Sequence, residues 1–207
     1  MGRGDKSLAL LGGKSLLAHA IDRLRPQVSA LILNANGDPE RFSAFGLPVV
    51  PDSVAGLVGP LAGILAGMLW ARKNLPEIRH VAVVATDTPF IPADLVARLH
   101  TALDEDHTIA IARYGDRDYP VFGVFPVTVA EDLESFLRES RNLAVMAWLD
   151  RHRTAAVIFD PADSQSSNPF FNINTPDDLA KAEEAWNAAR GAGTDKPPAT
   201  ASGRRST

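Results

Sequence analysis

The sequence predicts an α/β domain of three layers, a mostly parallel β-sheet with helices on both faces. Apolar segments of strand length alternate along the chain with segments that have helical periodicity. The most strand-like segment, residues 80–87, is apolar on both faces, as is typical of a central parallel strand. The 207 residues are 45% hydrophobic, which is enough for the core of one domain of ordinary size.

The first quarter of the chain carries clear start and stop signals. Leu16, Leu17, Ala20, Ile21 and Leu24 recur at helical spacing, and Pro26 ends that segment. Asp38 and Pro39 are typical of an N-cap and a first helical residue. We therefore predict a hairpin turn at 12–15, a helix at 15–24, a strand at 28–33, a short helix at 38–45 and a strand at 47–50.

The rest of the chain continues the same alternation. A last helix begins after Thr175, the expected N-cap, with Pro176 as its first residue. The remaining segments are helices at 59–74, 92–103, 129–139, 142–151 and 174–190, and strands at 80–87, 107–114, 120–125 and 155–160, of which 107–114 and 120–125 are expected to be locally antiparallel. Residues 191–207 are rich in small and polar residues, which predicts a disordered tail.

Composition narrows the class of partner. The net charge of −4 gives no general attraction to nucleic acid or to an anionic membrane, so we expect neither as a partner. The absence of cysteine excludes disulfides, thiolate nucleophiles and cysteine metal sites. No apolar segment approaches the roughly 20 residues of a membrane span, and no secretory leader opens the chain, so the expected location is the cytoplasm.

Polar residues follow several predicted strands, where ligands bind in such sheets. Asp87, after the central strand, is suited to hold Mg²⁺ that bridges to substrate phosphates, or it is a turn or N-cap aspartate before Pro89. Asn34 and Asn36 either contact a base or ribose, or form a turn. Asp52 either accepts hydrogen bonds from a ligand or only ends a strand.

Two basic or glycine-rich features have equally open interpretations. Gly59, Gly63 and Gly67 lie on one stripe of a predicted helix, where each glycine costs roughly 1 kcal/mol. Either the helix packs closely on the sheet, or a ligand approaches at the Gly59 end. Lys6, after a glycine-rich turn, suits a phosphate, although a basic turn at a chain end is also typical of a frayed terminus.

The order of several motifs resembles one enzyme family. "MGRGDKSLALLGGKSLLAHAIDRL", "LNAN", "GLPVVPDS", "GPLAGILAG", "DTPFIP", "RDYPVFGVF" and "FFNINTPDDL" occur as in molybdenum cofactor guanylyltransferases, which have the Rossmann-like nucleotide-diphospho-sugar transferase fold. The resemblance runs from Met1 to about Trp186. The "DTPFIP" motif is shared with cytidylyl- and uridylyltransferases, whereas "GPLAG" with "NINTP" narrows the match. The resemblance implies a nucleotidyltransferase domain at residues 1–190.

The resemblance implies a reaction and its residues. GMP is transferred from GTP to molybdopterin with loss of pyrophosphate, Mg²⁺ offsets phosphate charge, and a cofactor-delivery protein and a molybdoenzyme apoprotein are further partners. By position, Lys6 and Asp87 are the catalytic residues, Lys6 contacting the phosphates and Asp87 binding Mg²⁺ and the nucleotide. Asn34 and Asp52 contact the nucleoside. Weaker candidates are Gly59 and Gly63 near the nucleotide, and Asn172 and Asn174 on the pterin side.

The sequence departs from this family in two places. Tyr119 stands where the family often has histidine, which leaves the role of that position open. Family members begin with an apolar strand, a Leu-Ala-Gly-Gly loop and an Arg-Met-Gly turn, and Met1 matches the methionine of that turn. The first strand and loop are therefore expected to be missing. A misplaced start would explain this, and it agrees better with the intact downstream motifs than a truncated protein does. The strands at 28–33 and 81–86 would then expose unpaired edges.

Two alternatives remain open at this point. A cytidylyltransferase, acting on the same pterin or on a sugar phosphate, would share the fold and the "DTPFIP" motif. A non-catalytic module that carries the cofactor would fit the missing loop. A comparison of GTP, CTP and UTP as substrates separates these possibilities.

Overall fold

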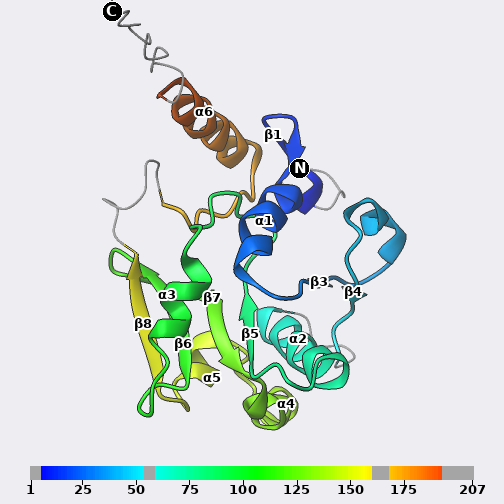
Figure 1. Cartoon of the computed structure of the whole chain (residues 1–207), viewed down its shortest axis with the longest axis vertical. Helices are drawn as coiled ribbons and strands as arrows, with labels where there is room; N and C mark the ends of the chain where they lie inside the picture. Colours follow the sequence, from blue (N-terminus) through cyan, green and yellow to red (C-terminus); the bar gives the residue numbers. More distant parts are fainter. Residues whose placement is uncertain (1–5, 54–58, 160–167, 193–207) are drawn as a thin grey trace, which may run out of the picture.

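A four-stranded sheet forms the centre of the computed structural model, which describes residues 6–53, 59–159 and 168–192 (Figure 1). The order of its strands is β5-β7-β6-β8. Their bounds are β5 (His80–Val83), β6 (Ile109–Tyr114), β7 (Arg117–Pro126) and β8 (Thr154–Phe159). The predicted strands at 107–114, 120–125 and 155–160 are thus confirmed, and the one at 80–87 is shorter than predicted.

Strand direction fixes which ends of the strands meet. β7 pairs antiparallel with both β5 and β6, and β6 pairs parallel with β8. Consequently β5, β6 and β8 run in one direction and β7 runs against them, which confirms the local antiparallel pairing predicted at 107–125 within a sheet of otherwise parallel direction. The carboxyl ends of β5, β6 and β8 therefore lie at one edge of the sheet.

Helices cover both faces of this sheet, which gives the three predicted layers (Figure 1). On β6, Ile109 and Ile111 pack on one face with α2, α4 and α5, whereas Ala110 and Ala112 pack on the other face with α3. This alternation along β6 follows from the two-residue period of a strand. The helix bounds are α1 (Leu16–Leu24), α2 (Pro60–Asn74), α3 (Leu95–Thr101), α4 (Ala130–Glu139), α5 (Val145–Leu149) and α6 (Pro176–Ala192).

The predicted helix starts are confirmed at three positions, where the capping side chain accepts a hydrogen bond from a backbone N–H two or three residues further along the chain. The Ser15 hydroxyl caps α1 by accepting the N–H of Ala18 at 3.2 Å. Asp38 caps the N–H of Glu40 at 3.0 Å, and the short helix that follows is the 3₁₀ helix η3 (Pro39–Phe45). Thr175 accepts the N–H of Asp178 at 3.1 Å and begins α6. The tail predicted from residue 191 lies outside the described residues from 193 onward.

The predicted strand at 28–33 is wrong in extent. Only Leu33 and Asn34 form a strand, β3, which pairs parallel with β4 (Val49–Val50) in a separate two-stranded sheet. Within the described residues, β3 has no second partner and β5 pairs only with β7, so the expectation of open edges is confirmed there. An extended segment is held as a strand by its neighbours, and residues 28–32 have no described strand beside them.

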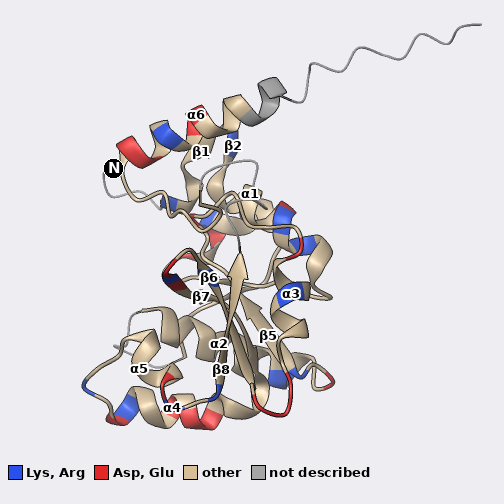
Figure 2. Cartoon of the chain, turned by 90° about the vertical axis from the view of Figure 1, so that its left-hand side faces the viewer, with Lys and Arg blue, Asp and Glu red and all other residues tan. Residues whose placement is uncertain are grey.

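A hairpin and the last helix form the end of the molecule beyond the sheet (Figure 2). The hairpin consists of β1 (Leu10–Leu11) and β2 (Lys14–Ser15), and Gly12 and Gly13 turn it with positive φ angles of 56° and 83°. The Trp186 indole of α6 packs against the ring of His19, whose Nε2 lies 2.9 Å from the Leu11 carbonyl oxygen. Among the described residues, no helix combines the length and apolar character needed to cross a membrane.

Gly12 is the residue on which docking of α6 depends most directly. A Cβ at Gly12 would lie under 3.0 Å from Nε1 of Trp186, whereas a Cβ at Gly115, with nearly the same φ of 57°, would meet nothing within 4 Å. We expect Gly115→Ala to lower the free energy of unfolding by about 1–2 kcal/mol through backbone strain alone. Gly12→Ala should lower it by about 1–3 kcal/mol more through overpacking. Equal losses in urea titrations would contradict this account.

Candidate functional site

Residues from three distant parts of the chain meet beyond the carboxyl end of β5. The backbone carbonyl of Asp87 accepts the N–H of Ile173 at 3.1 Å, so the segment around residue 173 lies against the end of this strand. The buried Thr88 hydroxyl donates to Oδ1 of Asn172 at 3.2 Å. The Lys6 Nζ donates to Oδ1 of Asn174 at 3.2 Å. Lys6, Asp87, Asn172 and Asn174, all expected as site residues, therefore form one set.

The Asp87 carboxylate is half-buried and electrostatically unusual. Burial raises the pKa of Asp87, and a hydrogen bond from its own backbone and the positive charge of Lys6 oppose that rise. Asp87 does not cap the following helix, because α3 begins at Leu95 and Asp94 holds the N-cap position. The N-cap interpretation is therefore wrong, whereas Asp87 does lie in a turn, as the other half of that alternative predicted. Its carboxylate is a desolvated acceptor at the sheet edge that a cation would stabilise.

A second set lies at the carboxyl ends of β3 and β4. The Asn34 Nδ2 donates both to Oδ1 of Asp52 and to the Val50 carbonyl, each at 3.0 Å. The Asn36 Nδ2 donates to Oδ2 of Asp52 at 2.7 Å, and the Asp52 N–H donates to Oδ1 of Asn36 at 2.9 Å. Asn34 and Asn36, for which a simple turn is the alternative interpretation, thus donate hydrogen bonds to the two oxygens of one carboxylate.

The glycine stripe on α2 has two roles in the structure. A Cβ at Gly63 would lie under 3.0 Å from Oδ1 of Asn34, so this glycine makes room for a side chain of the second set. A Cβ at Gly67 would lie 3.4 Å from Val81, an ordinary packing distance. Gly59 precedes α2 with φ 136°, and its carbonyl accepts the Ala62 N–H at 3.1 Å. Close packing therefore accounts for Gly67 and contributes at Gly63, which also lines the cavity, and Gly59 and Gly63 both remain predicted ligand contacts.

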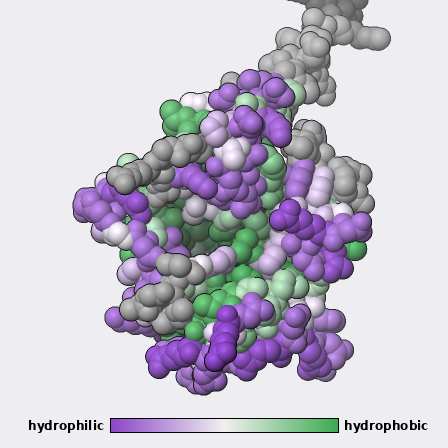
Figure 3. Space-filling view, turned by 180° about the vertical axis from the view of Figure 1, so that it is seen from behind, coloured by the Kyte–Doolittle hydropathy of each residue, from purple (hydrophilic) through white to green (hydrophobic). Residues whose placement is uncertain are grey.

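One cavity connects the two sets of polar residues. Its volume is about 720 Å³, within the range of pockets that bind small ligands. Asn34 and Gly63 line it on one side, and Asp87 and Asn172 line it on another, while Asp52 is joined to it through Asn34. Apolar side chains of β5 and of residues 28–33 supply much of its remaining wall. Figure 3 shows an apolar hollow ringed by hydrophilic side chains on the rear face.

Tyr119 has a supporting position behind this site. It is 9% exposed and packs with the rings of Phe122 and Phe170. Its hydroxyl accepts a hydrogen bond from Nδ2 of Asn168 at 2.6 Å. Tyr119 therefore anchors the start of the segment that carries Asn172. Sequence reasoning missed Thr88 and Asn168, because no local signal pairs residues that are 84 and 49 positions from their partners.

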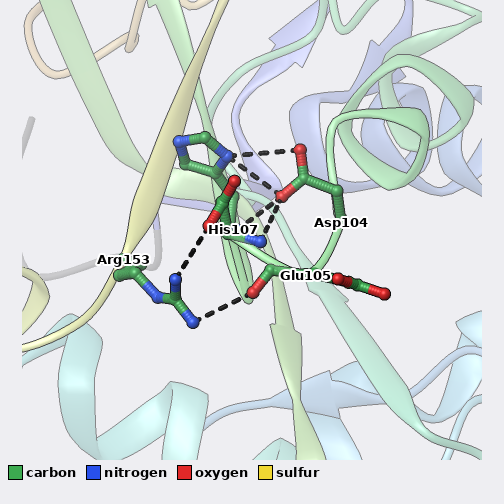
Figure 4. Close-up of polar contacts among 5 residues, drawn as sticks. Asp104, Glu105, His107 and Arg153 are labelled. Carbon is green, nitrogen blue, oxygen red and sulfur yellow. Dashed lines mark hydrogen bonds and ion pairs between the residues drawn. The ribbon is translucent and has the colours of Figure 1, made fainter.

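A further polar cluster lies at the opposite edge of the sheet. Asp104 accepts the N–H groups of Asp106 and His107, and Arg153 donates to Asp106 and to the Glu105 carbonyl (Figure 4). These residues precede β6 and β8, so they join the amino ends of those strands, away from Asp87. Within the described ranges, no group of three or more His, Cys, Asp or Glu residues is arranged to hold a metal ion.

Comparisons with known proteins agree on one family. A family model described as MobA-like NTP transferase domain matches residues 1–156. The molybdenum cofactor guanylyltransferase of Bradyrhizobium sp. (strain ORS 278) is 48% identical over 186 residues, which are 88% of this chain and 85% of the relative.

Solved structures agree on the fold. The molybdopterin-guanine dinucleotide biosynthesis protein A of Archaeoglobus fulgidus superposes with a TM-score of 0.67 at 22% identity, covering 90% of this chain and 92% of that one. A manganese complex of Rv0371C from Mycobacterium tuberculosis H37Rv has a TM-score of 0.65 at 20% identity, covering 88% and 93%. At these identities the likeness establishes the fold alone.

Proposed function

Because the chain belongs to the family of MobA-like NTP transferase domains, we propose that it transfers GMP from GTP to molybdopterin. An oxygen of the terminal phosphate of molybdopterin attacks the α-phosphorus of GTP. The bond between that phosphorus and the oxygen that bridges to the β-phosphate breaks, and pyrophosphate leaves with the electron pair. The products are the guanine dinucleotide form of the cofactor and pyrophosphate.

One observation carries the proposal. Asp87 and Asn172 from one set and Asn34 from the other line a single cavity, and Asp52 is hydrogen-bonded to Asn34. Lys6 lies outside the cavity lining, where it donates to Asn174 and acts on Asp87 through its charge. One set offers an amine and a carboxylate suited to phosphates and a cation, and the other offers amide and carboxylate groups suited to a nucleoside. A nucleoside triphosphate has both of these parts.

The phosphate end of the site works by charge. Lys6 supplies a positive charge close to the Asp87 carboxylate, and we assign it to the GTP phosphates. The protein's task in such a reaction is to align the attacking and leaving oxygens and to stabilise the developing charge. Thr88 and Asn172 contribute by fixing the loop beside Asp87.

A divalent cation fits the chemistry of Asp87. Mg²⁺ is bound in phosphate-transfer sites by one or two carboxylates together with substrate phosphates and water, so a single half-buried carboxylate is a sufficient protein ligand. The raised pKa of Asp87, caused by burial, points the same way, because a cation would offset the cost of ionising it. The ion would neutralise phosphate charge when bound. We propose Mg²⁺ for this role.

The assignments of the other parts of the site rest on the family resemblance. We assign Asn34 and Asp52 to the nucleoside and Asn172 and Asn174 to the pterin side, with Gly59 and Gly63 near the nucleotide. The expected delivery protein, the receiving apoenzyme and the cytoplasmic location remain predictions.

Substrate preference tests the proposal. We expect pyrophosphate release with GTP and molybdopterin, and at least about tenfold lower kcat/KM with CTP or UTP, since a pocket that hydrogen-bonds one base leaves polar groups unpaired with another. The measurement is coupled pyrophosphate detection with each nucleotide in the presence of Mg²⁺. Preference for CTP would favour a cytidylyltransferase, and GTP binding without pyrophosphate release would favour a non-catalytic cofactor carrier.

A further inference from the structure

Two asparagine side chains donate to the two oxygens of the Asp52 carboxylate, which is more than an aspartate that only ends a strand requires. We infer that Asn36 and Gly63 are positioning residues that fix Asp52, together with Asn34, as an acceptor for two neighbouring hydrogen-bond donors of the nucleoside. The inference rests on the proposed function, because it states how the same site distinguishes its nucleotide. Neither Asn36 nor Gly63 needs to touch the ligand for this role.

Asn36 holds both the backbone and the side chain of Asp52. Its amide nitrogen donates to Oδ2 of Asp52 at 2.7 Å, and its amide oxygen accepts the Asp52 N–H at 2.9 Å. Asn34 donates to the other carboxylate oxygen at 3.0 Å. An ionised carboxylate has about four acceptor positions. Each oxygen therefore keeps capacity for a ligand, and the two oxygens are fixed side by side.

Gly63 determines where the Asn34 amide can lie. Besides the contact with Oδ1 of Asn34, a Cβ at Gly63 would be 3.2 Å from its Cγ, so the whole amide group would have to move. That amide also donates to the Val50 carbonyl at 3.0 Å, and the displaced group would lose two hydrogen bonds together. Alanine is otherwise favourable in a helix. Gly63→Ala is thus a substitution that disturbs Asp52 without weakening α2.

The chemistry of a fixed carboxylate defines the ligand group. Two neighbouring donors are needed, and a guanine nucleotide carries two such pairs: the N1–H and 2-amino groups of the base, and the two hydroxyls of the ribose. Both pairs would make charge-assisted hydrogen bonds to Asp52. ITP lacks the 2-amino group, and 2′-deoxy-GTP and 3′-deoxy-GTP each lack one ribose hydroxyl, so these analogues separate the two sources.

The experiment measures binding of Mg²⁺ complexes of GTP, ITP and the two deoxy analogues by calorimetry. We expect the unaltered protein to bind GTP at least about tenfold more tightly than one class of analogue, which corresponds to about 1.4 kcal/mol. In Gly63→Ala and Asn36→Ala, GTP should bind about as weakly as the discriminated analogue. The ratio of the analogue's dissociation constant to that of GTP should therefore fall close to one. A loss of discrimination against ITP assigns the base, and a loss against the deoxy analogues assigns the ribose.

Gly67→Ala is the matched control, because it is the same change one turn further along α2 and lines the same cavity, yet its Cβ would meet only Val81 at 3.4 Å and not Asn34. It should leave the GTP-to-analogue ratio unchanged, and its Tm should be no lower than that of the unaltered protein, because alanine is the better helix former. Far-UV circular dichroism should show that Gly63→Ala and Asn36→Ala remain folded. Unchanged discrimination in Gly63→Ala and Asn36→Ala, or equal binding of all four nucleotides by the unaltered protein, overturns the inference alone. Failure of the unaltered protein to bind GTP overturns the proposed function, and the inference with it.

Discussion

Asp87→Asn is expected to lower the rate of Mg²⁺-dependent GMP transfer by on the order of 10²–10³-fold, as does removal of one preorganised charge-stabilising group from other active sites. The asparagine keeps the size of the side chain and loses its negative charge. The cation then lacks its protein ligand, and the phosphates lose the charge compensation that aligns them. Initial rates of pyrophosphate release over a range of Mg²⁺ concentrations measure the effect.

The stability of Asp87→Asn should not fall with its activity. Because burial raises the pKa of Asp87 above its ordinary value, the folded state binds this proton more tightly than the unfolded state. The ionised carboxylate therefore costs folding free energy, and stability falls as the pH rises from the ordinary aspartate range through the raised pKa. Asp87→Asn removes that cost, so its free energy of unfolding at pH 7 without metal should equal or exceed that of the unaltered protein.

Asp150→Asn is the control for this pair of measurements. Asp150 is exposed after α5, and its substitution makes the same change of charge away from the cavity-lining residues. It should alter neither the transfer rate nor its dependence on Mg²⁺. A transfer rate for Asp87→Asn close to that of the unaltered protein would refute the metal-binding role of Asp87, and a large loss of stability would show that Asp87 is mainly structural.

Local chemistry made several parts of the fold predictable. The caps at Ser15, Asp38 and Thr175 depend on side chains that reach only two or three residues along the chain, so the sequence contains all their partners. The segment at 28–32 has strand-like composition but no described neighbouring strand. Its conformation depends on long-range pairing, which residue type alone does not specify.

The same distinction applies to the candidate site. From the sequence alone, the rule that ligands bind at the carboxyl ends of strands predicts that Asn34, Asp52 and Asp87 lie at one edge. That rule could not show that Asn34 donates to one oxygen of Asp52 and Asn36 to the other. It also could not show that only a glycine at position 63 leaves room for the Asn34 amide. Such details depend on side-chain positions set by tertiary packing between β3, β4 and α2.

Lys6→Gln is expected to lower kcat/KM for GTP by about ten- to a hundredfold, the effect of removing one charged contact to the phosphates. Glutamine can keep a hydrogen bond near Asn174 while the positive charge is lost. Lys14→Gln is a suitable control, because Lys14 pairs with Asp22 at the hairpin and carries the same charge on the same end of the molecule. Lys6→Arg should retain more activity than Lys6→Gln if charge is the main contribution.

The pH dependence distinguishes an effect of Lys6 on the pKa of Asp87 from an effect on the phosphates alone. Burial raises the pKa of Asp87, and the positive charge of Lys6 is one of the effects that restrain this rise. Without Lys6, the pKa of Asp87 should rise further, so protons compete with the cation up to a higher pH. The acid limb of Mg²⁺ binding should therefore move to higher pH in Lys6→Gln and stay in place in Lys14→Gln. A uniform loss of activity at all pH values would mean that Lys6 acts on the phosphates without tuning Asp87.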